Sequence, residues 1–362
     1  MKIGLLRESI GHTIINPIIY FSTFDVGNEL HIFIYRGNKI DNTTAFEIVK
    51  LALENKFNVI FIDSNFIFRI IYNIFYRFSF FNYFKHIIIS DIFNVHHDRN
   101  YEKIYKVKYK AWTNNPINLK FSTLQDNDVI FQKWKDKINL NNNFICIFSR
   151  DSTYHSDAIK SIRDTDFVKL IPSILYLINS GYQIVRMGRK HSNSPFINTI
   201  LEPYKKSFKY YDYDSLNEID DIFDIFLLKN CKYFISNNSG IIMPSYFFNT
   251  PLIIYDWVPS GVQPYFSNKS IYILKFYYYN GVLQKYENLP DEVKIVEDEE
   301  ILNNLGYRIK GNSPNVILEF IKRSINTEFL DSISPPENMI VYGGNTKIDR
   351  VWYDQYIKKI LI

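Results

Sequence analysis

The segment FICIFSRDS, residues 144–152, ends an apolar run with polar side chains, and similar junctions occur in YQIVRMG (182–188) and CKYFISNNSG (231–240). Each apolar run predicts a buried β-strand, and each polar or glycine-containing end predicts the loop that follows it. In open α/β sheets, ligands bind at the carboxyl ends of the strands. We therefore expect the three ends to meet in one crevice, and their residue types suit a nucleoside diphosphate.

Strand and helix signals alternate along the chain, which predicts an α/β protein with parallel sheets. The first part predicts a helix at 44–55 and strands at 2–6, 31–35, 59–62 and 86–90. The second part predicts helices at 165–180, 219–230 and 240–248 and strands at 144–148, 182–186, 233–235, 251–255 and 271–274. We place one domain at residues 1–135, a second at 136–330 and a tail at 331–362, with an amphipathic helix at 351–362.

Composition and charge limit the possible functions. The 362 residues are 46% hydrophobic and 22% charged, which is typical of a globular chain large enough for two cores. A net charge of +4 is too small to indicate nucleic-acid binding. Cys146 and Cys231 lie in apolar segments without metal-ligand spacing, so we expect buried free thiols, as in a reducing cytoplasm. We expect no metal, and we interpret Asp212-Tyr213-Asp214 as a solvated loop.

The order of the motifs resembles that of bacterial glycosyltransferases encoded in surface-polysaccharide loci, such as those for O-antigen. About half the chain carries the resemblance, in RDS (150–152), LINSGYQIVRMG (177–188), DIFDIFLLKNCKYFISNNSG (221–240), FFNTPLI (247–253) and RESIGHTIINP (7–17). The arrangement is more distantly similar to fucosyltransferase-type enzymes. The resemblance implies the GT-B fold, in which two Rossmann-like domains face a cleft and C-terminal helices cross back to the first domain.

The activity that the resemblance implies is metal-independent transfer of a sugar from a nucleotide-sugar donor to a glycan or lipid-linked saccharide. The donor would bind the C-terminal domain and the acceptor the N-terminal domain, with no other cofactor. Two other functions stay open because a fold does not determine a reaction. One is an epimerase or hydrolase of nucleotide sugars, and the other is a noncatalytic nucleotide- or glycan-binding subunit of a polysaccharide assembly complex.

Arg150 and the pair Ser239 and Gly240 are the strongest candidates on the donor side. Arg150 follows a buried strand, where a guanidinium can bind two phosphate oxygens and offset the charge of the leaving nucleotide. The alternative is an ion pair with Asp151 or Asp164. Ser239 and Gly240 precede a predicted helix, where a hydroxyl and backbone N–H groups can bind an anion. The alternative is that this segment, SNNSG, forms only a turn and a helix cap.

Four further residues are expected on the donor side. Ser152 belongs to the first strand end, together with Arg150. Arg186 and Gly188 follow the second strand, where we expect them near the base, the ribose or the second phosphate, with a tight turn as the alternative for Gly188. Asp224 is expected at a ribose hydroxyl, with the alternative that its carboxylate only stabilises a helix N-terminus.

In the first domain, His12 follows the first strand and a glycine, so we expect it in a loop that faces the cleft. An inverting transfer needs a base to deprotonate the acceptor hydroxyl, and the pKa range of histidine suits that task. Glu8 is the substitute carboxylate. The alternative is a loop histidine that hydrogen bonds only to backbone.

Membrane contact is predicted to be peripheral at most. The chain contains no run of about 18 apolar residues, the length that a spanning helix needs. Its start, MKIGLLRESIGH, predicts a strand rather than a signal peptide. For the aromatic segment Phe66–Phe84 we favour a helix packed in the first domain or a wall on the acceptor side. The alternative is an amphipathic helix on the inner membrane surface. We therefore predict a cytoplasmic protein, with peripheral attachment to the cytoplasmic membrane as the alternative.

Overall fold

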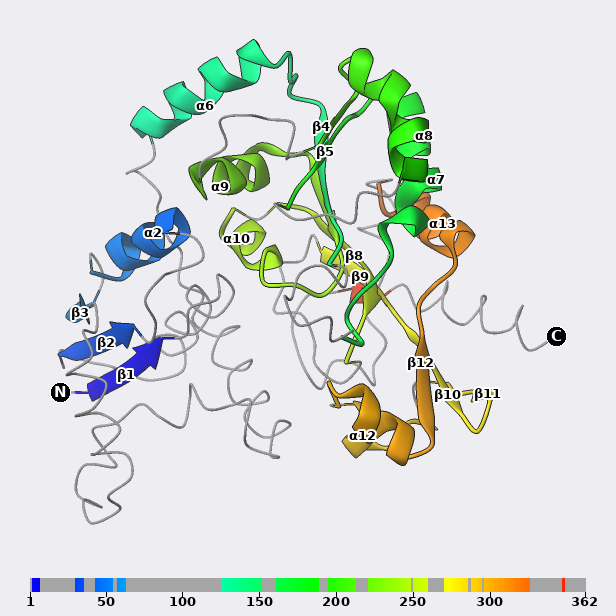
Figure 1. Ribbon diagram of the computed structural model, residues 1–362. Coiled ribbons are helices and arrows are strands. Elements are labelled where there is room, and N and C mark those ends of the chain that lie inside the picture. Colours follow the sequence, from blue (N-terminus) through cyan, green and yellow to red (C-terminus); the bar gives the residue numbers. More distant parts are fainter. Residues whose placement is uncertain are drawn as a thin grey trace. The chain divides into compact units, whose positions relative to one another are not determined.

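The computed structural model describes residues 2–6, 30–35, 43–54, 57–62, 125–150, 161–188, 195–212, 221–248, 250–259, 270–285, 288–294, 296–325 and 347–348. The chain divides into two compact units, residues 1–126 and 127–362. The divisions after residues 135 and 330 remain predictions. Phe66–Phe84, the strand at 86–90 and the helix at 351–362 lie outside the described residues. Figure 1 labels the helices and strands named below.

The first unit contains a parallel three-stranded sheet with a crossover helix. Its strands lie in the order β1-β2-β3, and α2 connects the second strand to the third. Phe46, Val49 and Leu53 recur at helical spacing on α2 and are buried, and the ring of Phe46 packs edge-on against Phe61 of β3 at 5.5 Å. The elements are β1 Lys2–Leu6, β2 His31–Tyr35, α2 Thr43–Glu54 and β3 Val59–Ile62, which confirms the predictions for these segments.

The second unit is built on a parallel seven-stranded sheet in the order β13-β9-β8-β7-β4-β5-β6. All five residues of β4 are buried, as expected for a central strand that is covered on both faces. The predicted strands are confirmed, whereas β6 and β13 were not predicted. The strands are β4 Phe144–Phe148, β5 Gln183–Arg186, β6 Tyr210–Asp212, β7 Tyr233–Ser236, β8 Leu252–Trp257, β9 Ser270–Leu274 and β13 Lys347–Ile348.

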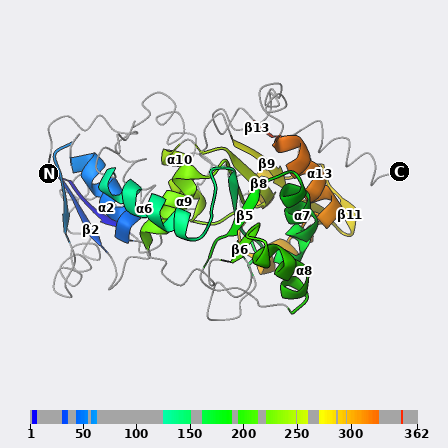
Figure 2. The same ribbon diagram turned by 90° about the horizontal axis from the view of Figure 1, so that it is seen from above.

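Helices cover both faces of this sheet, with α7, α8 and α13 on one side and α9 and α10 on the other (Figures 1 and 2). Ile145 and Ile147 of β4 pack with the first group in the main core. On α6, Phe131 stacks on Phe226 of α9 at 5.2 Å. The elements are α6 Gln125–Lys137, the 3-10 helix η2 Phe167–Leu170, α7 Ile171–Asn179, α8 Pro195–Lys206, α9 Asp221–Asn230, α10 Ile242–Phe247 and α13 Pro314–Ser324.

A small antiparallel sheet, in the order β11-β10-β12, extends the second unit and has its own apolar cluster, which includes Tyr277, Val293 and Leu302. Asn280 and Gly281 connect its hairpin with φ values of 48° and 82°, the left-handed conformation that an Asn-Gly turn favours. The elements are β10 Phe276–Tyr279, β11 Val282–Leu283, α11 Asp291–Lys294, α12 Glu299–Asn304 and β12 Tyr307–Lys310. In the part of the chain that the structure describes, no helix is both long and apolar enough to cross a membrane.

The edge strand β6 carries a tyrosine whose hydroxyl is held by backbone. The Tyr211 hydroxyl lies 3.0 Å from the carbonyl oxygen of Ile138 and 3.1 Å from that of Phe208, and it accepts from Gln183 Nε2 at 3.2 Å. Burial disfavours the phenolate and raises the pKa of Tyr211 from 10.0 to about 12. Because the folded-state pKa lies above the unfolded-state value, this contribution to stability is complete below pH 10 and is lost as the pH rises towards about 12.

Tyr211→Phe is expected to make the free energy of unfolding fall less steeply with pH above about pH 10. The phenylalanine variant has no phenol to titrate at this position, so it loses this part of the pH dependence. Urea unfolding at pH 8.5 and pH 11 measures the difference. Tyr278→Phe is the matched control, because no hydrogen bond to the described residues involves the Tyr278 hydroxyl. Equal pH dependence in the wild type and Tyr211→Phe would contradict the prediction.

Candidate functional site

The strand order of the second unit reverses between β4 and β7. The chain adds β5 and β6 on one side of β4 and then returns to place β7, β8 and β9 on the other side. Phe148 and Ser236, at the carboxyl ends of β4 and β7, are paired in register. The two strands lead to helices on opposite faces of the sheet, which leaves a natural ligand position between their loops. We call this position the switch point.

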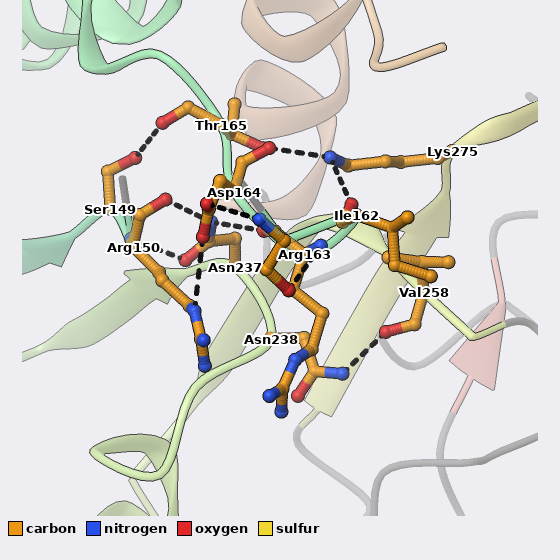
Figure 3. A network of polar contacts seen from close by, with 11 residues as sticks. Ser149, Arg150, Ile162, Arg163, Asp164, Thr165, Asn237, Asn238, Val258 and Lys275 are labelled. Carbon is orange, nitrogen blue, oxygen red and sulfur yellow. Dashed lines mark hydrogen bonds and ion pairs between the residues drawn. The ribbon is translucent and has the colours of Figure 1, made fainter. Parts of the chain in front are cut away.

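Asn237 joins the two loops of the switch point. Its Oδ1 accepts the backbone N–H of Arg150 at 2.8 Å, and its Nδ2 donates to the carbonyl oxygens of Arg150 and Arg163, each at 3.1 Å. The side chain is fully buried, and Figure 3 shows it between the two segments. Asn237 is therefore more than the turn former that the sequence pattern indicates. A polar residue directly after a buried strand was the available signal for this role.

Arg150 lies at the switch point as expected, and it forms one of the two ion pairs considered above. Its Nε donates to Asp164 Oδ1 at 3.1 Å, and both side chains are 6% exposed. The second oxygen of Asp164 accepts the backbone N–H of Ser161 at 2.8 Å. Ser149 and Thr165 add to this contact, because the Ser149 hydroxyl donates to the Thr165 carbonyl at 2.9 Å. The ion pair fixes Arg150 while leaving its guanidinium at the carboxyl end of β4.

Two further cations belong to the same network, and the sequence analysis missed both. Lys275 is buried, and its Nζ donates to the carbonyl oxygens of Ile162 and Asp164, each at 2.7 Å. Arg163 lies between those two residues and is half-buried. Figure 3 shows that the terminal nitrogens of Arg163 and Arg150 point to the same side of the network. Among the residues that the structure describes, this network thus contains three cationic side chains, Arg150, Arg163 and Lys275, and one carboxylate that pairs with them, Asp164.

The buried carboxylate of Asp256 connects this network to a further segment of the chain. Asp256 is fully buried at the end of β8, where its Oδ2 accepts the Thr165 hydroxyl at 3.0 Å. Its Oδ1 accepts the backbone N–H of Asn312 at 2.7 Å and the side-chain Nδ2 of Asn312 at 2.6 Å. A Cβ at Gly311 would lie 2.5 Å from Asp256 Oδ2 and 2.8 Å from Lys169 Nζ, so this close approach requires glycine. Asp256 thereby links the Thr165 loop to the segment that precedes α13.

Arg186 and Gly188 lie at the carboxyl end of β5, as predicted. The guanidinium of Arg186 lies 3.7 Å from the ring centre of Phe167, and its Nη1 is 3.8 Å from Asp212 Oδ1. Gly188 has a φ of 108°, as the tight-turn alternative requires. The roles of both residues towards a ligand remain predictions.

The interpretation of Asp212 as part of a solvated loop is wrong. Its side chain is 14% exposed, and its Oδ2 lies 2.5 Å from Lys205 Nζ. The Tyr210 hydroxyl donates to its Oδ1 at 2.8 Å. Burial, followed by the nearby Asp212 carboxylate, raises the pKa of Tyr210 well above its ordinary value. The sequence pattern missed this because β6 is a short edge strand that brings Asp212 beside Arg186.

Ser239 and Gly240 lie in the loop that follows β7, which is the other side of the switch point. Ser239 is 5% exposed, and no described residue hydrogen bonds to its hydroxyl. Gly240 accepts the backbone N–H of Met243 at 3.1 Å, which closes the turn into α10. α10 is only six residues long, so its N-terminus alone is a weak anion site. The feature of this loop that favours a ligand is instead the buried Ser239 hydroxyl.

Asp224 lies in the first turn of α9, beside the buried cysteines. Burial, then Cys231, then the Asp224 carboxylate raise the pKa of the Cys146 thiol well above its ordinary value. Both cysteines are buried and free, as predicted. The ribose-binding role of Asp224 remains a prediction.

Three predicted residues, Glu8, His12 and Ser152, lie outside the described residues, and their roles remain predictions. Within the described ranges, no three histidine, cysteine, aspartate or glutamate side chains lie close enough to hold a metal ion.

No protein-family model and no curated protein matches this sequence. Among solved structures, the glycosyl transferase family 9 protein from Veillonella parvula has a TM-score of 0.51 at 11% identity, covering 91% of this chain and 98% of that chain. ADP-heptose LPS heptosyltransferase II from E. coli has a TM-score of 0.46 at 15% identity, covering 84% of this chain and 98% of that chain. The resemblance to fucosyltransferase-type enzymes remains a prediction. The architecture and the likeness to the Veillonella protein together show that this chain has the fold of GT-B glycosyltransferases.

Proposed function

We propose that this protein is a glycosyltransferase whose nucleotide-sugar donor binds at the switch point. The proposal is carried by one observation: a buried guanidinium, Arg150, and a buried hydroxyl without a described partner, Ser239, lie on the two loops where the strand order reverses. Both groups donate hydrogen bonds, which suits the oxygens of a diphosphate. The GT-B fold supports the assignment.

In the proposed reaction the sugar leaves a nucleoside diphosphate, on which negative charge accumulates as the glycosidic bond breaks. Arg150 offsets that charge without a metal, since Asp164 holds its guanidinium in place before the ligand arrives. A fixed donor costs no reorganisation during the reaction, which is why such groups lower the barrier. Asn237 maintains the geometry by holding the Arg150 backbone.

We assign the acceptor to the first unit, with His12 as the base for its hydroxyl and Glu8 as the substitute. The acceptor class that we propose is a glycan or a lipid-linked saccharide of surface-polysaccharide synthesis. This assignment rests on the motif RESIGHTIINP at residues 7–17. It predicts that His12→Ala reduces sugar transfer while leaving donor binding unchanged.

Arg150→Gln is expected to weaken binding of the preferred nucleoside diphosphate by about 2 to 4 kcal/mol, the cost of losing a buried charge-assisted contact. Isothermal titration calorimetry with UDP, GDP, ADP, CMP and dTDP, followed by the sugar conjugates of any nucleotide that binds, measures the effect. Arg308→Gln is the matched control, because Arg308 is exposed on β12.

Three outcomes separate the possible functions. Binding of one nucleoside diphosphate to the wild type that Arg150→Gln weakens, together with transfer to an acceptor, supports the proposal. Donor binding without release of the sugar, unaffected by His12→Ala, supports a noncatalytic subunit. Release of free sugar or its epimer in the absence of an acceptor supports a hydrolase or an epimerase instead.

A further inference from the structure

Arg163 has a backbone that is fixed from both sides. Its carbonyl oxygen accepts Asn237 Nδ2 at 3.1 Å, and its own N–H donates to Ser161 Oγ at 3.3 Å. The carbonyl oxygens of the preceding and following residues both accept from Lys275 Nζ. Three polar side chains thus hold this short segment, so the Arg163 side chain leaves the backbone from a defined position at the switch point.

The guanidinium of Arg163 differs from those of its neighbours in its contacts. Arg150 pairs with Asp164, and Arg186 pairs with an aspartate and covers an aromatic ring. By contrast, no hydrogen bond or ion pair joins the Arg163 guanidinium to any residue that the structure describes. A half-buried cation is costly to desolvate unless an anion compensates it. Its fixed backbone and the absence of a partner among the described residues both favour an anionic ligand.

The charges of the described residues in this network indicate how many phosphoryl groups the site can bind. Arg150, Arg163 and Lys275 are cationic, and Asp164 is the carboxylate among the residues labelled in Figure 3. The next carboxylate, Asp256, is already bound by donors from other segments. Two guanidinium groups that point to the same side can each bind one phosphoryl group, because each presents a planar fork of N–H donors.

We propose that Arg163 binds the second phosphoryl group of the donor, so that the site selects nucleoside diphosphates over nucleoside monophosphates. The inference rests on the proposed function, because it assigns a further residue to the same donor site. Arg150 binds the other phosphoryl group, and Asp164 holds the Arg150 guanidinium in position. The donor class is therefore a sugar linked through a diphosphate, and a sugar linked through a single phosphate is excluded.

The test compares a nucleoside diphosphate with the monophosphate of the same base. Wild-type protein is expected to prefer the diphosphate, and Arg163→Gln is expected to bind it about 10- to 100-fold more weakly while binding of the monophosphate is nearly unchanged. Arg163→Lys keeps the charge and should recover part of the loss. Arg308→Gln is the control, and calorimetric titration of all four proteins gives the affinities. The melting temperature of Arg163→Gln should stay close to that of the wild type, because no described contact of its guanidinium is lost.

The inference and the proposed function fail in different ways. If the wild type binds no nucleotide, the proposed function is wrong and this inference falls with it. If the wild type binds a diphosphate and Arg163→Gln binds it equally well, the inference is wrong and the proposed function stands. An equal loss for diphosphate and monophosphate also overturns the selection that we propose. So does a large fall in the melting temperature of Arg163→Gln, because it would make Arg163 a structural residue.

Discussion

Asp256→Ala is expected to lower the free energy of unfolding by about 3 to 5 kcal/mol, because three buried hydrogen-bond donors lose their acceptor at about 1 to 3 kcal/mol each. The fully buried carboxylate accepts three hydrogen bonds, one from Thr165 and two from Asn312. Its removal leaves those buried donors without an acceptor. The backbone adds to the loss, because Asp256 has a φ of 53°, which alanine tolerates poorly.

Asp256→Asn removes the negative charge but keeps the size of the side chain, so it separates these two contributions to stability. Asparagine tolerates the positive φ and keeps one oxygen for Asn312, so we expect about half of the loss seen with alanine. Urea unfolding of both variants measures the difference, with Asp291→Ala as the control because the Asp291 side chain is 70% exposed. If Asp256→Ala costs no more than the control, the buried network contributes little to the stability of the second unit.

Asn237→Ala is expected to cost about 2 to 4 kcal/mol of stability and to abolish nucleotide binding. Three hydrogen bonds disappear, and the buried N–H of Arg150 loses its acceptor. The loops that follow β4 and β7 are then no longer joined, so Arg150 and Arg163 lose their defined positions. The loss of binding therefore exceeds what the loss of stability alone would produce.

Asn237→Asp is the matched variant, because it keeps the size and the acceptor of asparagine. A carboxylate cannot donate to the carbonyl oxygens of Arg150 and Arg163, so we expect it to be destabilising as well. Asn238→Ala is the control, since the Asn238 amide donates one hydrogen bond, to Val258. Thermal unfolding and nucleotide titration of the three variants test this account. Equal effects at positions 237 and 238 would show that Asn237 does not connect the loops.

The fold of the second unit was largely predictable because its strands are continuous apolar runs. β4, β5 and β7 were placed correctly, since burial on both faces leaves a sequence pattern that flanking polar residues delimit. β6 has three residues, too few to produce a pattern. The hairpin of β10 and β11 was missed although Asn280-Gly281 is a strong local turn signal.

The site was predictable only in part, because its partners come from distant segments. Arg150 and Ser239 follow predicted strands, so their positions could be inferred from topology. Lys275 and Ile162 are 113 residues apart in the chain, and Thr165 and Asp256 are 91 apart. Local periodicity contains no information about such pairs. The same reason explains why Asn237 was interpreted as a turn residue.

A crystal structure with the preferred nucleoside diphosphate bound tests the central claim most directly. We predict that the phosphates lie at the carboxyl ends of β4 and β7, within hydrogen-bonding distance of the Arg150 guanidinium and the Ser239 hydroxyl. Phosphates bound at the opposite edge of this sheet, or by residues 1–126 alone, would contradict it.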